Sequence, residues 1–244
     1  MSALAVGKRV YRYLIGRLSF RAVFIAVFGA AMLVLFLYHG RPGHFYRYFP
    51  DLARSLGPKK AAMYAYVYGH LVAFVVLFVL PALTIPLVFR ERVQDWGIRI
   101  TGAGREFGIV VVLFLLFLPV ILYFSTTAGF QSKYPKLKII RDSGSLFFLY
   151  QGAYLIKWFA WEFFFRGYLL FGFKTEVGEN AILFSTLPFV IVHMGKPEGE
   201  IFGAIAAGII LCRLSLRGGS IFPGVLLHWM VAGTMDFLNC TFWK

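Results

Sequence analysis

Charged residues are scarce in this sequence. Of its 244 residues, 15% are charged and 59% are hydrophobic, and the mean hydropathy is +0.74. Water-soluble domains usually carry about 25% charged residues. The composition excludes an ordinary soluble globular domain and indicates an integral membrane protein.

Cysteine and acidic residues are also few. The two cysteines, Cys212 and Cys240, end apolar segments without metal-ligand spacing, so they predict small buried side chains instead of a disulfide framework. Eleven acidic against 25 basic residues give a net charge of +14. Because the basic residues are spread over termini and loops, they predict contact with the lipid bilayer and no nucleic-acid partner.

Long apolar runs define the fold class. A helix needs roughly 20 apolar residues to cross the hydrocarbon core. The sequence predicts an all-α, polytopic membrane helix bundle with about seven transmembrane helices, six or eight being the alternatives. The predicted spans are Phe20–Tyr38, Ala62–Phe89, Gly108–Ser125, Leu146–Phe173, Ala181–His193, Ile201–Cys212 and Ile221–Leu238.

The predicted organisation is one integral membrane domain over residues 1–244. Residues 1–145 supply amino-terminal helices, and residues 146–244 form the part that carries the polar motifs. The start of the chain predicts a retained membrane anchor with a cytoplasmic amino terminus, because basic residues precede a long apolar span without a small-residue cleavage site. These residues are Lys8, Arg9, Arg12 and Arg17.

Among the ionisable residues inside or at the end of apolar segments, four stand out. Glu162 and Arg166 lie four residues apart, the spacing of an ion pair on one helix face. His193 and His228 lie on two later segments. Ionisable side chains at membrane depth cost roughly 2.5–3.5 kcal/mol on insertion scales. A structural ion pair explains Glu162 and Arg166 alone, but the two histidines indicate a functional site.

These residue types indicate hydrolysis inside the membrane. A carboxylate and an imidazole in a dry cavity can activate water, and a second imidazole can stabilise the developing oxyanion. We expect Glu162 with His193 to activate water, His228 to bind the oxyanion and Arg166 to hold Glu162. The same three donors, Glu162, His193 and His228, could also bind a divalent metal such as zinc, and the sequence leaves both options open.

Two further acids are secondary candidates. Glu200 follows Pro197 at the start of the sixth segment, where it either turns toward the cavity, or is a solvated loop acid or a helix amino-terminal charge favoured by the macrodipole. Asp236 lies two turns beyond His228 in an apolar helix and needs a partner.

The motifs resemble those of the CAAX-protease and bacteriocin-processing family of intramembrane proteases, also called the Abi family. The family motifs are Glu-Glu-x-x-x-Arg, Phe-x-x-x-His and His-x-x-x-Asn on successive helices. They correspond here, over about the last 100 residues, to Trp161-Glu162-Phe-Phe-Phe-Arg166, Phe189-Val-Ile-Val-His193 and His228-Trp-Met-Val-Ala232. Trp161 replaces the glutamate that looks like the water activator of the family, and Ala232 replaces the asparagine.

The resemblance implies an intramembrane endopeptidase that acts on membrane-associated proteins or peptides. The compact chain with short loops favours a bacterial version in the inner membrane. Trp161 and Ala232 motivate a second hypothesis, a catalytically inactive relative that acts as a membrane scaffold or binds a partner. A small transporter is the third hypothesis, against which no inverted repeat is visible.

Overall fold

The apolar segments form helices, as a computed structural model of the chain shows for residues 16, 18–100 and 102–241. The basic segment with Lys8, Arg9, Arg12 and Arg17 lies outside the described residues. The first half contains α2 (Phe20–His39), α3 (Pro42–Tyr48), α4 (Pro50–Phe74), α5 (Leu80–Thr84) and α6 (Gly104–Ser125). The second half contains α7 (Ala128–Lys133), α8 (Gly144–Glu162), α9 (Gly172–Val177), α10 (Ala181–Ile191), α11 (Glu198–Gly218) and α12 (Phe222–Thr241).

Shorter helical turns connect or extend these helices. The π-helical segments are η1 (Val75–Val79), η2 (Ile85–Phe89) and η5 (Phe163–Phe171), and the 3₁₀ segments are η3 (Val93–Trp96), η4 (Lys138–Asp142) and η6 (Gly178–Asn180). No described residue belongs to a strand. The all-α, polytopic membrane fold predicted from the sequence is confirmed.

Each predicted apolar segment coincides with a helix, although several boundaries differ. Four helices of the described part are long and apolar enough to cross a membrane: Phe20–His39, Pro50–Phe89, Gly104–Ser125 and Glu198–Gly218. The segment predicted to be short at Ile201–Cys212 is part of a helix of 21 residues. The segment predicted over Ala181–His193 leaves the helix at Ile191, so His193 lies in the following turn.

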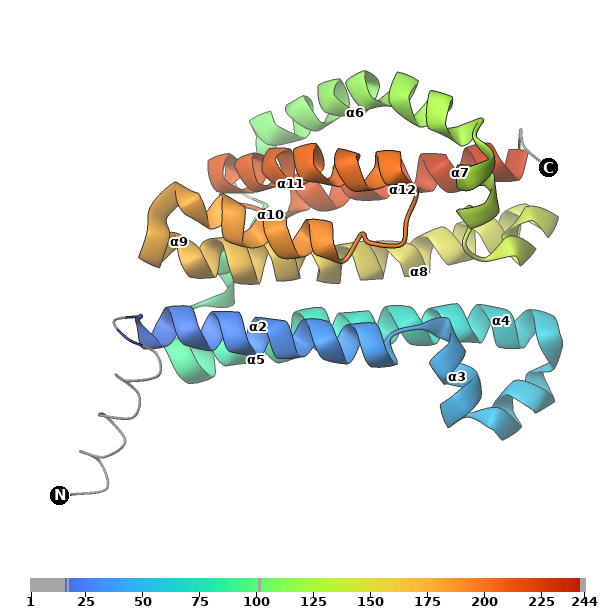
Figure 1. Cartoon of the computed structure of the whole chain (residues 1–244), viewed down its shortest axis with the longest axis horizontal. Helices are drawn as coiled ribbons and strands as arrows, with labels where there is room; N and C mark the ends of the chain where they lie inside the picture. The colour runs from blue at the N-terminus through green and yellow to red at the C-terminus, as the bar shows by residue number, and fades with distance from the viewer. Residues whose placement is uncertain (1–15, 17, 101, 242–244) are drawn as a thin grey trace.

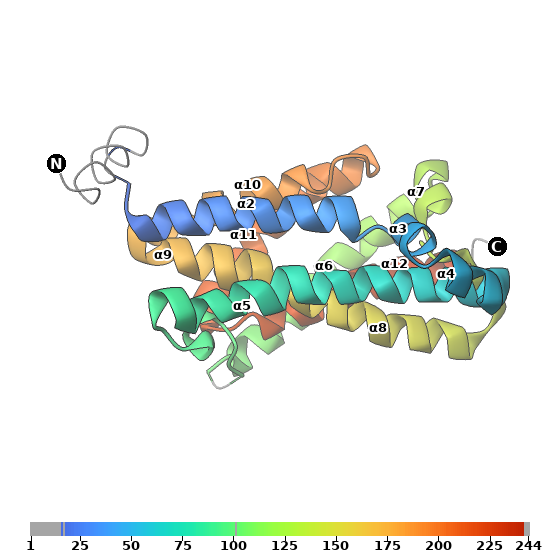
Figure 2. The same cartoon turned by 90° about the horizontal axis from the view of Figure 1, so that it is seen from below.

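The helices stack in layers (Figure 1). One layer contains α2 with α4 and α5, which run side by side when the molecule is turned (Figure 2). The next contains α8, α9 and α10. Beyond it lie α11 and α12, and α6 covers α12 from the outside. The carboxyl-terminal helices therefore occupy the middle of the stack, between the amino-terminal layer and α6.

A polar clamp ties the start of α2 to the loop before α6. Arg21 donates to Glu91 at 2.5 Å and to the backbone oxygen of Gly172 at 3.1 Å. The indole of Trp96 donates to the other oxygen of Glu91 at 2.8 Å. The hydrogen bond from Arg21 lowers the pKa of Glu91 below its ordinary value of 4.5. The clamp thus fixes the amino-terminal layer against α9.

The centre of the apolar core lies on η5. Phe163, Phe164, Phe165 and Leu170 are fully buried there. Every residue from Phe163 to Leu170 is buried, so this segment is surrounded by protein on all sides. η5 follows α8 without a break, so the most buried backbone of the chain directly follows Glu162.

Candidate active site

Glu162 and Arg166 form an ion pair in the interior. Both side chains have no exposed surface, and Nη1 of Arg166 lies 3.3 Å from Oε1 of Glu162. The guanidinium carbon also lies 4.0 Å from the ring centroid of Phe189 on α10, a cation–π distance. Buried charges of this kind require partners. The pair predicted from the spacing is therefore formed.

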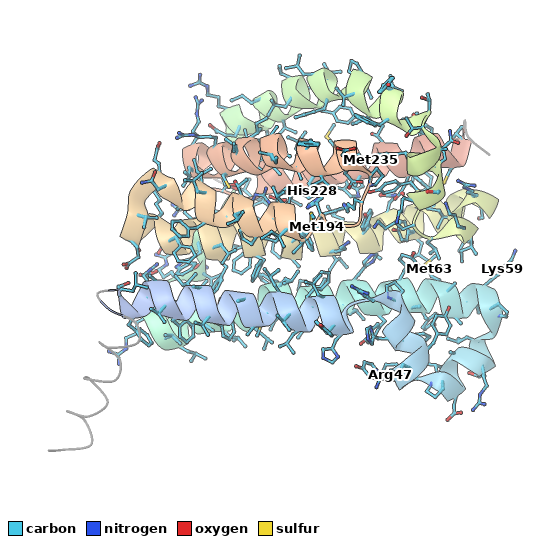
Figure 3. The ribbon with its side chains drawn as sticks, viewed as in Figure 1. Arg47, Lys59, Met63, Met194, His228 and Met235 are labelled. Carbon is cyan, nitrogen blue, oxygen red and sulfur yellow. The ribbon has the colours of Figure 1, made fainter. Side chains whose placement is uncertain are left out.

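His228 on α12 is the second partner of Glu162. Its Nδ1 lies 2.7 Å from Oε1 of Glu162, and its ring stacks on Trp158 with centroids 3.8 Å apart. A Cβ atom at Gly224, one turn before His228, would lie 3.0 Å from Oε2 of Glu162. The missing side chain at Gly224 therefore leaves room for the carboxylate. Figure 3 places His228 in the interior of the stack, whereas Arg47 and Lys59 extend from its periphery.

His193 is held by the end of α10, the helix that it follows. Its Nδ1 lies 2.6 Å from the backbone oxygen of Phe189. A carbonyl oxygen only accepts, so Nδ1 carries the proton in this hydrogen bond and Nε2 of the neutral ring is an acceptor. His193 therefore presents a defined tautomer.

Both imidazoles line one cavity of about 170 Å³. Its polar lining also includes Tyr134, Lys196 and Glu200. Its remaining walls are mostly apolar. Most of their residues belong to three helices: Phe117, Val120, Ile121 and Phe124 of α6, Ala204, Ala207, Ile210 and Leu211 of α11, and Leu227, Val231 and Ala232 of α12. A water-sized molecule or an apolar chain fits such a space.

The side chains at positions 161 and 162 face different histidines. Glu162 bonds to His228, whereas the ring of Trp161 lies 6.4 Å from that of His193 and 5.6 Å from that of Phe36 on α2. Successive positions on a helix point about 100° apart, which explains the difference. The sequence predicted that Glu162 pairs with His193. In the structure, Glu162 pairs with His228 instead, and Glu162 does not line the cavity.

The two secondary acids occupy different places. Glu200 lines the cavity and accepts hydrogen bonds from Tyr134 and Lys196. Asp236 lies away from the cavity, fully buried, and accepts a hydrogen bond of 3.1 Å from Gln151 on α8. Asp236 therefore has the partner that its burial requires, and it links α12 to α8.

Tyr134 and Lys196 were missed by the sequence analysis. The sequence contained a signal for Lys196, because this residue follows the predicted site residue His193 by three positions. Tyr134 had none, since it is 66 residues from Glu200 in the chain. Burial, followed by the charge of Glu200, raises the pKa of Tyr134 well above its usual range, so the phenol remains a hydrogen-bond donor.

The three predicted metal donors do not form a metal centre. Among the described residues, no group of three or more histidine, cysteine, aspartate or glutamate side chains is arranged to hold a metal ion. Glu162 is engaged in a buried hydrogen bond to His228, and only the two histidines line the cavity, so the three residues do not fit the metal-bound alternative.

Residues 143–234 match the family model described as type II CAAX prenyl endopeptidase Rce1-like. This segment contains all three motifs and both imidazoles. Neither the curated proteins nor the solved structures contain a match. From the start of α8 into α12, the chain is thus similar to Rce1-like type II CAAX prenyl endopeptidases, in agreement with the resemblance of the motifs, and its long apolar helices indicate an integral membrane protein.

Proposed function

We propose that the protein is an intramembrane endopeptidase in which His193 and His228 act on opposite sides of a peptide carbonyl. The observation that carries this proposal is the shared cavity, which both imidazoles line with their Nδ1 atoms already engaged. Nε2 of each ring is thus the nitrogen available to a molecule in the cavity. The Rce1-like match supports the reaction class.

His193 is suited to hold the attacking water. Its Nδ1 donates to a backbone carbonyl, so its neutral Nε2 accepts a hydrogen bond from water and makes the water oxygen more nucleophilic. This role agrees with the sequence-based expectation for His193.

His228 is suited to stabilise the oxyanion. Its Nδ1 faces the carboxylate of Glu162, which stabilises a positive charge on the ring. An imidazolium donates from Nε2 to the oxygen that becomes negative when water attacks. Arg166 holds Glu162 in position, so the carboxylate assists His228 instead of touching the water.

The substrates in this proposal are membrane-associated proteins or peptides, and the site lies in the inner membrane of a bacterial cell. The apolar walls of the cavity suit a substrate segment that enters from the lipid.

The test compares the peptides of cells that express the wild-type chain, His193→Gln or His228→Gln. We expect new peptide termini from membrane proteins only with the wild type, and at least about a hundredfold loss of the same cleavage with either purified variant. Unchanged melting temperature and elution volume in detergent control for folding.

A second candidate is a partner-binding protein without activity. It is favoured by Trp161 and Ala232, which replace the glutamate and the asparagine of the family motifs. Trp161 is buried against Phe36, and Ala232 contributes a methyl group to the cavity wall. Identical peptide termini with wild type and both variants would overturn the protease proposal in favour of this one.

A further inference from the structure

The cavity contains a carboxylate that the motifs do not account for. Among the described residues that line it, Glu200 is the only acid. Glu162 is fully buried behind His228, and position 161 carries a tryptophan. We propose that Glu200 is the catalytic carboxylate of this protein and accepts the proton of the water held by His193. This inference rests on the proposed peptidase function.

The carboxylate of Glu200 is fixed at the cavity wall. Its side chain is 12% exposed, and the hydroxyl of Tyr134 lies 3.0 Å from each of its oxygens. Lys196 forms an ion pair with Oε1. A carboxylate offers about four acceptor positions, so these two partners leave room for a hydrogen bond from water. Glu200 is thus an acid in the first turn of α11, as one alternative from the sequence had it, but its side chain is largely buried at the cavity instead of solvated.

A short connection joins His193 to Glu200. The backbone N–H of Lys196 donates to the oxygen of His193 at 3.1 Å, and Pro197 is the N-cap of α11, which places Glu200 in the first turn of that helix. The connection thus places the imidazole and the carboxylate in the wall of the same cavity. A glutamate on α11 can thus supply the function that Trp161 on α8 lacks.

The proposed reaction is balanced without another reactant. The water oxygen forms a bond to the carbonyl carbon while one of its O–H bonds breaks, and the proton goes to Glu200. The oxyanion is stabilised by His228. The C–N bond then breaks, and Glu200 returns the proton to the leaving amine, giving a carboxylic acid and an amine.

The test uses the full-length protein in liposomes with a peptide that the wild type cleaves and His193→Gln does not. We expect Glu200→Gln to lower kcat at least about a hundredfold with little change in KM, because only proton transfer is lost. Glu198→Gln is the matched control, since Glu198 lies in the same helical turn and is exposed. We expect it to cleave like the wild type.

Rescue by a small acid separates catalysis from structure. Formate should restore part of the activity of Glu200→Ala in proportion to its concentration, whereas chloride at equal ionic strength should not. Tyr134→Phe, which keeps the carboxylate, should retain at least about a tenth of the wild-type kcat, because the hydroxyl is one neutral hydrogen-bond donor.

The contrary outcomes are distinct. If Glu200→Gln cleaves like Glu198→Gln while His193→Gln is inactive, the Glu200 assignment is wrong and the peptidase proposal stands. Equal losses in Tyr134→Phe and Glu200→Gln, without formate rescue, would also overturn the assignment by showing a structural role. A wild type that cleaves nothing would overturn the proposed function itself.

Discussion

Helix α2 is more apolar than helix α11, and yet it is less buried. The most apolar window of α2 has a mean hydropathy of 2.4 with 17% of its residues buried, whereas that of α11 has 1.7 with 33% buried. α2 buries only Ile25, Gly29 and Met32, none of which is polar. In a bilayer, apolar side chains can face lipid at no cost, while polar ones must face protein. Ionisable residues thus identify the central helices better than hydropathy does.

The largest expected effect concerns the polar centre. Arg166→Met should lower the free energy of unfolding by about 3–5 kcal/mol, because it leaves the buried carboxylate of Glu162 without its cation. Unfolding by SDS titration in lipid–detergent micelles measures this change. The double variant Glu162→Gln/Arg166→Met should recover part of the loss, and a single variant as stable as the wild type would contradict a central role for the pair.

A smaller loss of stability is expected at Gly224, where α12 approaches α8. Gly224→Ala should cost about 1–3 kcal/mol, since its Cβ would meet Oε2 of Glu162 at 3.0 Å and Leu211 at 3.5 Å. It should also reduce peptide cleavage by shifting Glu162 from His228. Gly152→Ala on α8 is the control, because nothing lies within 4 Å of the added carbon. Equal melting temperatures for the two variants would argue against tight packing at Gly224.

The clamp of the amino-terminal layer should have a weaker, pH-dependent effect. The pKa of Glu91 is lowered in the folded state, chiefly by Arg21. The clamp therefore stabilises the fold fully at a pH above 4.5, the ordinary pKa of the carboxyl group. This stabilisation is lost as the pH falls through the lower pKa of the folded state. Glu91→Gln should therefore melt slightly below the wild type at pH 7, with the difference shrinking at acidic pH. A difference that grows on acidification would show the opposite linkage.

The smallest effect is expected on the lipid-facing side of α2. Val34, with 53% exposure, can be replaced by alanine with a change of less than about 0.5 kcal/mol. Phe164→Ala in η5 should instead cost about 3–5 kcal/mol, because this side chain is fully buried. Similar melting temperatures for the two variants in lipid would remove the contrast between the two regions.

Sequence patterns predicted the helices, but they paired Glu162 with His193, whereas the structure pairs it with His228. Apolar runs locate helices because membrane-spanning backbone must satisfy its own hydrogen bonds. The four-residue spacing predicted the contact of Glu162 with Arg166. Which histidine meets Glu162 depends on how α8, α10 and α12 rotate against one another, and spacing within one helix contains no such information. The hydrogen bond from Tyr134 to Glu200 likewise depends on the path of a loop.

The wide turns of η5 have a consequence for insertions and deletions. A π-helix accommodates an additional residue in its turns compared with an α-helix. Removing one residue between Phe163 and Phe171 would allow regular α-helical winding and swing everything after the deletion by about 100°. Glu162, on the amino-terminal side, would keep its direction, while Lys174 and Glu176 would rotate toward new neighbours. Length variants in this nine-residue stretch should therefore decouple α9 from Arg21.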